Sequence, residues 1–405
     1  MISIIIPMYN TENYIEKCLK SVLDQSFADI EVIVINDGST DASEAIVRSI
    51  AEGDLRVHLF SQENHGLVHA RKQGIRHATG EYVLFVDGDD WISENAVEEL
   101  FKLARDNDAD VVASGAMKAY LFENSNEEFR EESPEENGSY WTFLKEANIA
   151  EPGLYRGEKL EELKRKLFCM EETFCLALLP YLWNKLWKRE LIERFVLAAD
   201  ERITVGEDVA IGFPAILASE SLVVTNACFY YYRQSNASMM KTIGDEQAEY
   251  ENARRLDSYL RDKCAELGYL DQVGAGLDRF LFNQVCTRAY SVLNREKECQ
   301  GLYPFMDQMP ENLVIYGAGE LGKTVYRYAS GKTNVKAWID GRADIYQRLE
   351  MPVISINEYI PDAQDTIVVA VFRKKSVDAI VKDLADKGAR EENIHSIIIP
   401  ENLDL

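Results

Sequence analysis

Hydrophobic and polar positions alternate along the first 115 residues in a pattern typical of strands joined by helices. Apolar stretches predict strands at residues 2–7, 30–35, 57–60, 82–86 and 110–113. Four apolar residues after the first strand recur at helical spacing: Ile15, Leu19, Val22 and Leu23. Residues 41–44, Asp-Ala-Ser-Glu, have the form of a capping box that opens the next helix. This alternation predicts an α/β fold with a doubly wound, mostly parallel sheet and a ligand crevice at the carboxyl ends of its strands.

The pattern changes after residue 122. Residues 123–139 carry seven glutamates and one arginine among Asn, Ser, Pro and Gly, which predicts a loop, either a flap or a solvated excursion. From about residue 245 to residue 293 helical spacing dominates, with an apolar stripe at Tyr250, Leu256, Leu260, Cys264 and Leu267. A second set of apolar strands is predicted at residues 313–316, 335–340, 353–354, 366–371 and 394–399.

The length of the chain indicates more than one domain. At 405 residues it exceeds what one hydrophobic core usually supports. We expect an N-terminal α/β domain at residues 1–240, a helical spacer at 241–311 and a small Rossmann-like α/β domain at 312–405.

Charge and cysteine content narrow the class of protein. The chain has 69 acidic and 44 basic residues, and its formal charge of −25 opposes binding to nucleic acid or anionic lipid through bulk electrostatics. Its seven cysteines form no C-x-x-C pair, which suits packing residues in a reducing compartment. No basic segment precedes the first strand, and no apolar run approaches the roughly 20 residues that span a bilayer. We expect a cytoplasmic protein without a signal peptide or a nucleic-acid partner, and leave open peripheral association with the inner face of a membrane.

Three carboxylates stand within four positions at Asp87, Asp89 and Asp90, directly after the apolar run 82–86. Like charges this close repel each other unless a cation lies beside them, and a divalent metal ion with oxygen ligands is the usual solution. A polar turn before the next helix is the alternative.

Two more polar residues follow neighbouring strands of the predicted sheet. Asp37 ends the second strand, and Arg71 lies early in the helix after the third. The predicted topology brings both to the sheet edge that carries the acidic cluster, because parallel strands end together. An acid, a guanidinium group and a metal-type cluster at one edge suit a nucleoside diphosphate.

Four motifs stand in order within ninety residues. They are Ser-Ile-Ile-Ile-Pro-Met-Tyr-Asn at 3–10, Val-Ile-Asn-Asp-Gly-Ser-Thr-Asp at 34–41, Asn-His-Gly-Leu at 64–67 with Ala-Arg at 70–71, and Gly-Glu-Tyr at 80–82 leading to Asp-Gly-Asp-Asp at 87–90. Together they resemble glycosyltransferase family 2, whose members have the GT-A fold. The resemblance implies that Pro7 and Tyr9 border the nucleobase of a nucleotide-sugar donor, although core packing is the alternative for Tyr9.

The resemblance also implies roles for the polar residues at the sheet edge. Asp37 binds the base or the ribose, Arg71 lies by the base and the diphosphate, and Asp87 approaches the ribose. Asp89 binds Mn²⁺ or Mg²⁺, which bridges the diphosphate oxygens and acts as a Lewis acid on the leaving group. Lys72 departs from the asparagine that many relatives have after this arginine.

The acceptor half is read from Glu207 and Asp208, which precede an apolar stretch. Family 2 enzymes typically invert the anomeric centre, and this pair resembles the family's Glu-Asp step, in which the aspartate is the general base. Asp208 is therefore the expected base and Glu207 its orienting neighbour, with a helix N-cap as the alternative. Trp183 or Trp187 would stack on an acceptor sugar unless both pack in the core. Strand packing explains the aromatic segment 229–233.

The C-terminal part contains a second motif. Gly317, Gly319 and Gly322 follow an apolar strand and open a helix, and Asp340 ends the next strand. This context meets the requirement for a Rossmann-type nucleotide site, in which a helix N-terminus favours a phosphate and the acid holds a ribose hydroxyl. The unit spans only about half a dinucleotide-binding fold. Ligand binding there is left open.

The sequence predicts an inverting, metal-dependent glycosyltransferase. It would move a sugar from a nucleotide-diphosphate donor, with a UDP-sugar expected, to a glycan or lipid-linked acceptor in bacterial surface polysaccharide synthesis. The alternatives are transfer of a sugar phosphate or polyol phosphate, a non-catalytic nucleotide-sugar-binding scaffold, and an oxidoreductase built on the C-terminal unit, which lacks a proton-transfer residue.

Overall fold

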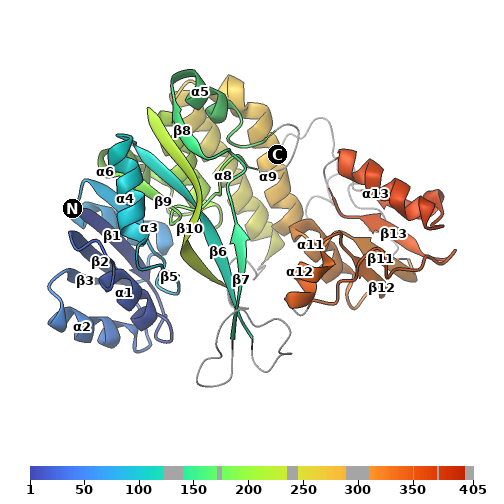
Figure 1. Cartoon of the computed structure of the whole chain (residues 1–405), viewed down its shortest axis with the longest axis horizontal. Helices are drawn as coiled ribbons and strands as arrows, with labels where there is room; N and C mark the ends of the chain where they lie inside the picture. Colours follow the sequence, from blue (N-terminus) through green and yellow to red (C-terminus); the bar gives the residue numbers. More distant parts are fainter. Residues whose placement is uncertain are drawn as a thin grey trace. The chain divides into compact units, whose positions relative to one another are not determined.

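The computed structural model describes residues 1–122, 140–170, 176–234, 245–288, 310–349, 351–371 and 374–396 (Figure 1). The predicted loop at 123–139 lies outside these residues. The chain divides into two compact units. The first comprises residues 1–170, 175–241 and 254–277, and the second comprises residues 171–174, 242–253 and 278–405.

The first unit contains a ten-stranded sheet with the order β3-β2-β1-β4-β9-β6-β10-β5, to which β7 and β8 add at β6 and β10. Its parallel half consists of β1 (Ile2–Met8), β2 (Ile30–Asp37), β3 (Val57–Gln62) and β4 (Tyr82–Phe85). The other half is mixed and consists of β5 (Trp91–Ile92), β6 (Val111–Phe122), β7 (Tyr140–Glu146), β8 (Gly153–Arg156), β9 (Lys185–Lys188) and β10 (Ser221–Gln234). The parallel sheet was predicted, whereas the antiparallel β9 between β4 and β6 was not.

The apolar periodicity explains the core of this unit. All seven residues of β1 are buried, because strands on both sides and helices cover it. Helix α1 (Ile15–Leu23) buries Ile15, Cys18, Leu19 and Val22, the stripe that its helical spacing indicates. The other helices of the unit are α2 (Ser43–Gly53), α3 (Leu67–His77), α4 (Ala96–Asp106), α5 (Gly157–Arg165), α6 (Arg189–Ala198) and α7 (Glu207–Ala218).

The predicted capping box before α2 is wrong. Ala42 is the N-cap residue, and no side chain caps the helix. Asp41 lies one residue earlier, where it accepts hydrogen bonds from the backbone N–H groups of Ser43 and Glu12. The side chain of Glu44 accepts a hydrogen bond from Asn36 instead of reaching back to the helix start. Contacts with neighbouring loops therefore replace the local cap.

Two long helices, α8 (Glu246–Glu266) and α9 (Leu270–Arg288), lie in the segment predicted as a helical spacer. Their residues are divided between the two units. The domain boundaries at 240 and 311 stay predictions. Within the described residues, no helix is both long enough and apolar enough to span a bilayer.

The second unit is a small α/β structure with a four-stranded parallel sheet in the order β12-β11-β13-β14. Its strands are β11 (Asn312–Tyr316), β12 (Asn334–Ile339), β13 (Thr366–Val369) and β14 (Ile394–Ser396), and its helices include α11 (Glu320–Ala329), α12 (Ala343–Arg348) and α13 (Lys374–Asp386). Separate apolar clusters lie on the two faces of the sheet. The predicted strand at 353–354 is reduced to a single bridge between Ile354 and Ile339.

Candidate functional site

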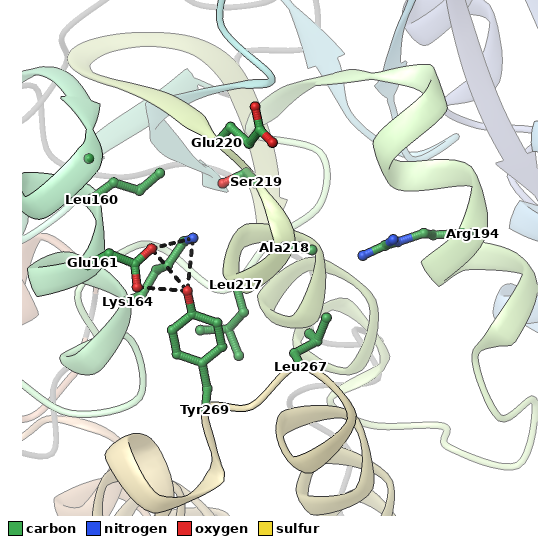
Figure 2. A pocket seen from close by; sticks show the side chains of 11 residues that line it. Leu160, Glu161, Lys164, Arg194, Leu217, Ala218, Ser219, Glu220, Leu267 and Tyr269 are labelled. Carbon is green, nitrogen blue, oxygen red and sulfur yellow. Dashed lines mark hydrogen bonds and ion pairs between the residues drawn. The ribbon is translucent and has the colours of Figure 1, made fainter.

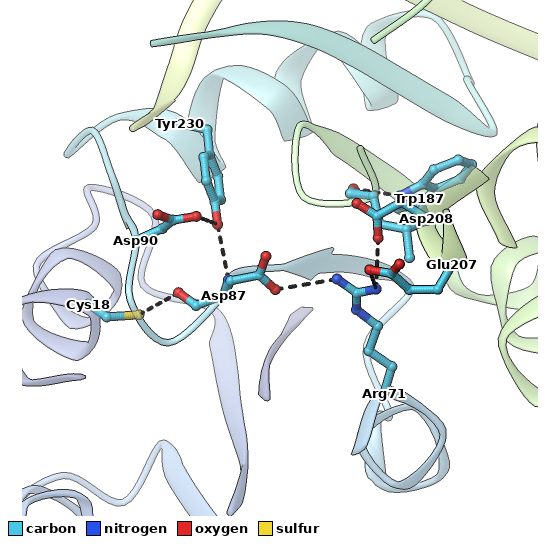
Figure 3. A network of polar contacts seen from close by, with 9 residues as sticks. Cys18, Arg71, Asp87, Asp90, Trp187, Glu207, Asp208 and Tyr230 are labelled. Carbon is cyan, nitrogen blue, oxygen red and sulfur yellow. Dashed lines mark hydrogen bonds and ion pairs between the residues drawn. The ribbon is translucent and has the colours of Figure 1, made fainter. Parts of the chain in front are cut away.

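The register of the parallel strands brings the predicted site residues to one edge of the first sheet. Met8 pairs with Asn36, and Ile5 pairs with Phe85, so β1, β2 and β4 end close together. The turn that follows β4 carries the acidic cluster, residues 87–90, which we call the acidic turn. Figure 3 shows Arg71 from α3 reaching between this turn and the start of α7.

Asp90 is the buried member of the acidic turn, with 1% of its surface exposed. Its Oδ2 accepts a hydrogen bond from the Tyr230 hydroxyl at 2.8 Å, and its Oδ1 accepts one from the Arg233 backbone N–H at 2.7 Å. Burial raises the pKa of Asp90 well above its ordinary value, and the charges of Asp89 and Asp87 add to the rise. Asp90 therefore ties the turn to β10. It does not start a helix, because α4 begins at Ala96.

Asp87 and Asp89 are half-buried. Burial raises the pKa of Asp87 to about 6, against the opposing effect of Arg71, whose Nη2 lies 3.4 Å from its Oδ1. Burial also raises the pKa of Asp89. In the described part of the chain no cation forms an ion pair with the Asp89 carboxylate, although Arg233 donates to the backbone carbonyl of Asp89 at 2.7 Å. A half-buried carboxylate of this kind is a hard oxygen donor, which suits Mn²⁺ or Mg²⁺.

Arg71 is the centre of the charged network, and its side chain is 1% exposed. Its Nη1 lies 2.7 Å from Asp208 Oδ1 and 3.5 Å from Glu207 Oε1. Burial acts to lower the pKa of Arg71, but Asp208, Asp87 and Glu207 outweigh it and raise the pKa. Among the described residues, the buried Nε of Arg71 has no hydrogen-bond partner. One guanidinium group thus faces three carboxylates.

The two acids of α7 stand at its first turn. The preceding Gly206 is the N-cap residue at φ 88°, a backbone conformation that strains residues with a Cβ atom and so favours glycine. Neither acid is the N-cap, which corrects the alternative reading. Burial raises the pKa of Glu207 to about 7, and the neighbouring charge of Asp208 contributes. A helix N-terminus favours both carboxylates electrostatically.

Asp37 is 4% exposed and is already bonded within the chain. Its Oδ1 accepts hydrogen bonds from Gln62 Nε2 and from the backbone N–H of His65, and its Oδ2 accepts the N–H of Gly66 at 2.8 Å. Since α3 begins directly after Gly66, Asp37 fixes the start of the helix that carries Arg71. The sequence did not predict that Asp37 holds the start of α3.

The two predicted nucleobase neighbours differ in exposure. Pro7 is buried within β1. Tyr9 is 49% exposed, so it does not pack in the core. Core packing, the alternative given for Tyr9, is therefore excluded.

Trp183 and Trp187 are 3% and 0% exposed, which is incompatible with stacking on a sugar. Trp183 lies between the rings of Tyr181 and Tyr230, with ring centroids 4.3 and 4.0 Å away. The hypothesis that either tryptophan binds the acceptor is therefore wrong. Trp187 Nε1 donates to the Leu182 carbonyl at 3.1 Å, within the core.

Sequence reasoning missed Lys185, which is 1% exposed. Its Nζ donates to the carbonyls of Leu179 and Tyr181 at 2.6 Å each and to Asn184 Oδ1 at 2.8 Å. Burial lowers the pKa of Lys185 to about 7, while the charge of Asp208 acts to raise it. A lysine enclosed by tryptophans in an apolar segment was the signal available in the sequence.

A cavity of about 470 Å³ lies elsewhere in the first unit, between α5, α6 and the end of α7 (Figure 2). Its buried cation, Lys164, pairs with Glu161 at 2.9 Å and donates to the Tyr269 hydroxyl at 3.1 Å. Tyr269 also donates to Glu161. These groups satisfy one another, and the cavity contains none of the predicted site residues.

In the second unit the glycine-rich turn joins β11 to α11. A Cβ atom on Gly322 would lie 1.8 Å from the carbonyl oxygen of Gly317, so glycine is required there. Asp340 Oδ2 accepts the backbone N–H of Ala318 at 2.7 Å, and its Oδ1 accepts that of Arg342 at 2.8 Å. Gly319 is the N-cap residue of α11. The acid predicted to hold a ribose is thus engaged by the chain.

Comparison with known proteins agrees with the geometry of the first unit. Residues 3–167 match the family model "Glycosyl transferase family 2". An uncharacterised glycosyltransferase of Bacillus subtilis, EpsJ, is 35% identical over 239 residues, which are 59% of this chain and 62% of that protein. Glycosyltransferase GlyA of Streptococcus pneumoniae is 34% identical over 240 residues, 59% of this chain and 31% of that protein. The chain therefore matches less than two thirds of the length of these relatives.

A solved structure supports the same fold. The crystal structure of S. aureus TarS 1–349 in complex with UDP-GlcNAc has a TM-score of 0.50 and 20% sequence identity, covering 73% of this chain and 76% of that one. At this identity the likeness concerns the fold alone. The first unit therefore has the GT-A fold, and its residues 3–167 are similar to glycosyl transferase family 2.

Proposed function

We propose that this chain is an inverting glycosyltransferase that moves a sugar from a nucleotide-diphosphate sugar, with a UDP-sugar expected, to a glycan or lipid-linked acceptor in bacterial surface polysaccharide synthesis. One observation carries the proposal. Arg71 joins Asp87 of the acidic turn to Glu207 and Asp208 of α7, although these segments are about 120 residues apart. The donor-side and acceptor-side acids of a sugar transfer therefore meet at one buried cation. The family match and the glycosyltransferase relatives support it.

On the donor side, Pro7 and Tyr9 border the nucleobase in this proposal. Asp37 accepts one hydrogen bond at Oδ2 and two at Oδ1 from the described residues, so Oδ2 keeps a lone pair for a base or ribose donor. Asp87 approaches the ribose. In this proposal Arg71 lies by the base and the diphosphate, and it attracts the diphosphate through its charge, because its side chain is only 1% exposed.

Asp89 is the proposed ligand of Mn²⁺ or Mg²⁺. Burial raises the pKa of Asp89 although the charge of Arg233 acts to lower it, so a divalent cation would stabilise the ionised carboxylate. Such an ion supplies Lewis acidity to the departing diphosphate. Among the described residues, no group of three His, Cys, Asp or Glu side chains forms a metal site alone. In the proposal the diphosphate provides further oxygen ligands.

On the acceptor side, Asp208 takes the proton of the attacking hydroxyl. The acceptor oxygen forms a bond to the anomeric carbon as the bond from that carbon to the diphosphate oxygen breaks, and the nucleoside diphosphate leaves. Asp208 Oδ1 is held by Arg71, so Oδ2 is the oxygen that receives the proton.

A nucleotide-release screen tests this function. The full chain is incubated with a panel of nucleotide sugars, with Mn²⁺ or with EDTA, and with extracted glycans and lipid-linked sugars as acceptors. Release of nucleoside diphosphate that EDTA abolishes supports the proposal. Release of nucleoside monophosphate would replace it with phosphoryl transfer, and saturable donor binding without any product would replace it with a scaffold.

Nucleotide binding by the second unit, at Gly317, Gly319, Gly322 and Asp340, stays a separate proposal. It is supported by the strand, turn and helix arrangement and by the N-terminus of α11. Equilibrium dialysis of the full chain with labelled UDP, UDP-sugars and NAD tests it. A second nucleotide bound per chain, lost on substitution of Gly319 by glutamate, is the expected result.

A further inference from the structure

Two residues of β10 contact the acidic turn from a position about 140 residues later in the chain. Tyr230 uses its hydroxyl twice, since it accepts the backbone N–H of Asp87 at 3.0 Å and donates to Asp90 Oδ2 at 2.8 Å. Arg233 donates its backbone N–H to Asp90 Oδ1 and its Nε to the backbone carbonyl of Asp89. Figure 3 shows the Tyr230 hydroxyl between Asp87 and Asp90. Each of the three acidic residues is thus held at a backbone or carboxylate atom.

These contacts divide the three carboxylates by availability. Both oxygens of Asp90 are bonded to β10, which removes Asp90 from ligand binding. Asp87 is tethered at its N–H by Tyr230 and at its carboxylate by Arg71. The backbone of Asp89 is fixed, while its carboxylate remains outside any ion pair in the described chain. The division follows from hydrogen bonds of β10 rather than from the order of the acids in the sequence.

The rigidity of Tyr230 comes from packing on several sides. The residue is 2% exposed, and its ring stacks on Trp183 at a centroid distance of 4.0 Å and an interplanar angle of 18°. Its backbone pairs with Ile92 in β5 and Ala116 in β6. The pairing of β10 with β6 shifts register just before Tyr230, and such irregularities redirect side chains next to functional sites. The hydroxyl therefore has little freedom to leave the turn.

We infer that Tyr230 is a positioning residue of the donor site: through its hydroxyl, and together with Asp90, it fixes the acidic turn so that the Asp89 carboxylate is presented to a divalent cation and the donor diphosphate. The inference rests on the proposed function and adds a residue to it. Tyr230 touches neither the cation nor the donor. It acts on the backbone that carries Asp89, in the way that outer hydrogen bonds orient metal ligands in general.

The substitution Tyr230→Phe tests this role because it keeps the ring and its stack on Trp183 but deletes both hydrogen bonds. Tyr82→Phe is the matched control. Tyr82 is 3% exposed in β4 of the same sheet, and its hydroxyl donates to the Ala109 carbonyl, away from the acidic turn. Binding of Mn²⁺ to the full chain is titrated with and without UDP, by the electron paramagnetic resonance signal of the free ion. Thermal unfolding of each variant is measured alongside.

We expect Tyr230→Phe to weaken Mn²⁺ binding in the presence of UDP by about 10-fold or more, the usual cost of losing an outer hydrogen bond at a metal site. Tyr82→Phe should lower the unfolding temperature by a similar amount but leave Mn²⁺ affinity within about twofold. Asp90→Asn should resemble Tyr230→Phe, because the amide has no charge and only one acceptor oxygen for the two donors of β10. The double variant should be no weaker than either single variant, since both changes break one clamp.

The outcomes separate this inference from the proposed function. If the wild-type chain binds no Mn²⁺ with UDP, the metal site itself is wrong and the inference falls with it. If wild type binds Mn²⁺ and Tyr230→Phe binds it equally well, only the positioning role is wrong. Equal weakening by Tyr230→Phe and Tyr82→Phe would also overturn it, because a general loss of stability would then explain both.

Discussion

The acidic turn after β4 and the glycine-rich turn after β11 occupy equivalent places in their sheets, but their carboxylates have different partners. Each follows a buried parallel strand at the carboxyl edge of a sheet. In the second unit Asp340 accepts two backbone N–H groups. At the edge of the first sheet, Arg71 forms ion pairs with three carboxylates, and its Nε has no hydrogen-bond partner among the described residues. The pKa values of Asp87 and Glu207 are raised.

This difference teaches that strand-turn-helix geometry locates an edge but does not make it reactive. Unsatisfied buried polar groups and perturbed carboxylates cost stability, so they persist where a ligand or a reaction uses them. By that criterion the first turn is the better candidate for chemistry. In the second turn, backbone N–H groups already occupy the carboxylate of Asp340.

The largest expected effect concerns the base. Asp208→Asn keeps the size of the side chain but removes the proton acceptor, so sugar transfer should fall about 10³-fold, within the range that a general base contributes. Donor binding, measured by titration calorimetry with UDP, should change little because the acidic turn is intact. Turnover within about tenfold of wild type would contradict the assignment and move attention to Glu207.

Substitution of Arg71 tests whether the three nearby carboxylates need this cation for the stability of the fold. Arg71→Met leaves three carboxylates crowded without their partner and should lower the free energy of unfolding by about 3–5 kcal/mol, as for other broken buried ion pairs. Arg76→Met, at an exposed position of the same helix, is the control and should stay within about 0.5 kcal/mol. Urea denaturation at pH 7.5 measures both. Equal stability of the two variants would mean that Arg71 is not the centre of the network.

The fold and the site were predictable to different depths. The strands at residues 2–7, 30–35 and 57–60 and the helix after the first strand were visible because their apolar periodicity is local. The pairing of Arg71 with Asp208 was not, since it joins residues 137 positions apart. The Tyr230 clamp was missed for the same reason, at a separation of 140. Long-range contacts depend on how β9 and β10 enter the sheet, and periodicity does not reveal their order.

Burial explains why the tryptophan hypothesis was wrong. A tryptophan is equally suited to a sugar face and to a core, and only the packing of Tyr181 and Tyr230 around Trp183 decides between them. The donor role of Asp37 stays a proposal. Its hydrogen bonds to the loop before α3 were not predictable, because they form only once that loop is folded.

The free energy of unfolding should depend on pH through the raised pKa values of the acids around Arg71. The pKa of Glu207 is raised from 4.5 to about 7 in the folded chain, so folding favours its protonated form. Its contribution to stability is full below pH 4.5 and is lost as the pH rises to about 7. Glu207→Gln should therefore flatten this part of the profile, leaving the contribution of Asp87, whose pKa rises from 3.8 to about 6.

Urea denaturation at half-unit steps from pH 4.5 to 7.5 measures this effect. Glu201→Gln is the control, because a hydrogen bond from Lys72 lowers the pKa of Glu201 and its contribution is lost only as the pH falls. The control should keep the wild-type slope between pH 5 and 7. An unchanged slope in Glu207→Gln would show that Glu207 is ionised throughout this range.

The smallest expected effect lies in the second unit. Asp340→Ala removes the acceptor for the N–H groups of Ala318 and Arg342, and should cost about 1–2 kcal/mol of local stability. Amide hydrogen exchange of residues 313–322 in the full chain measures the loss, because opening of this turn sets the exchange rate. Faster exchange confined to this turn would confirm that Asp340 is a structural acceptor. Unchanged or slower exchange would show that the fold does not need the carboxylate, and would place this turn beside the acidic turn as a site that holds an acid for a ligand.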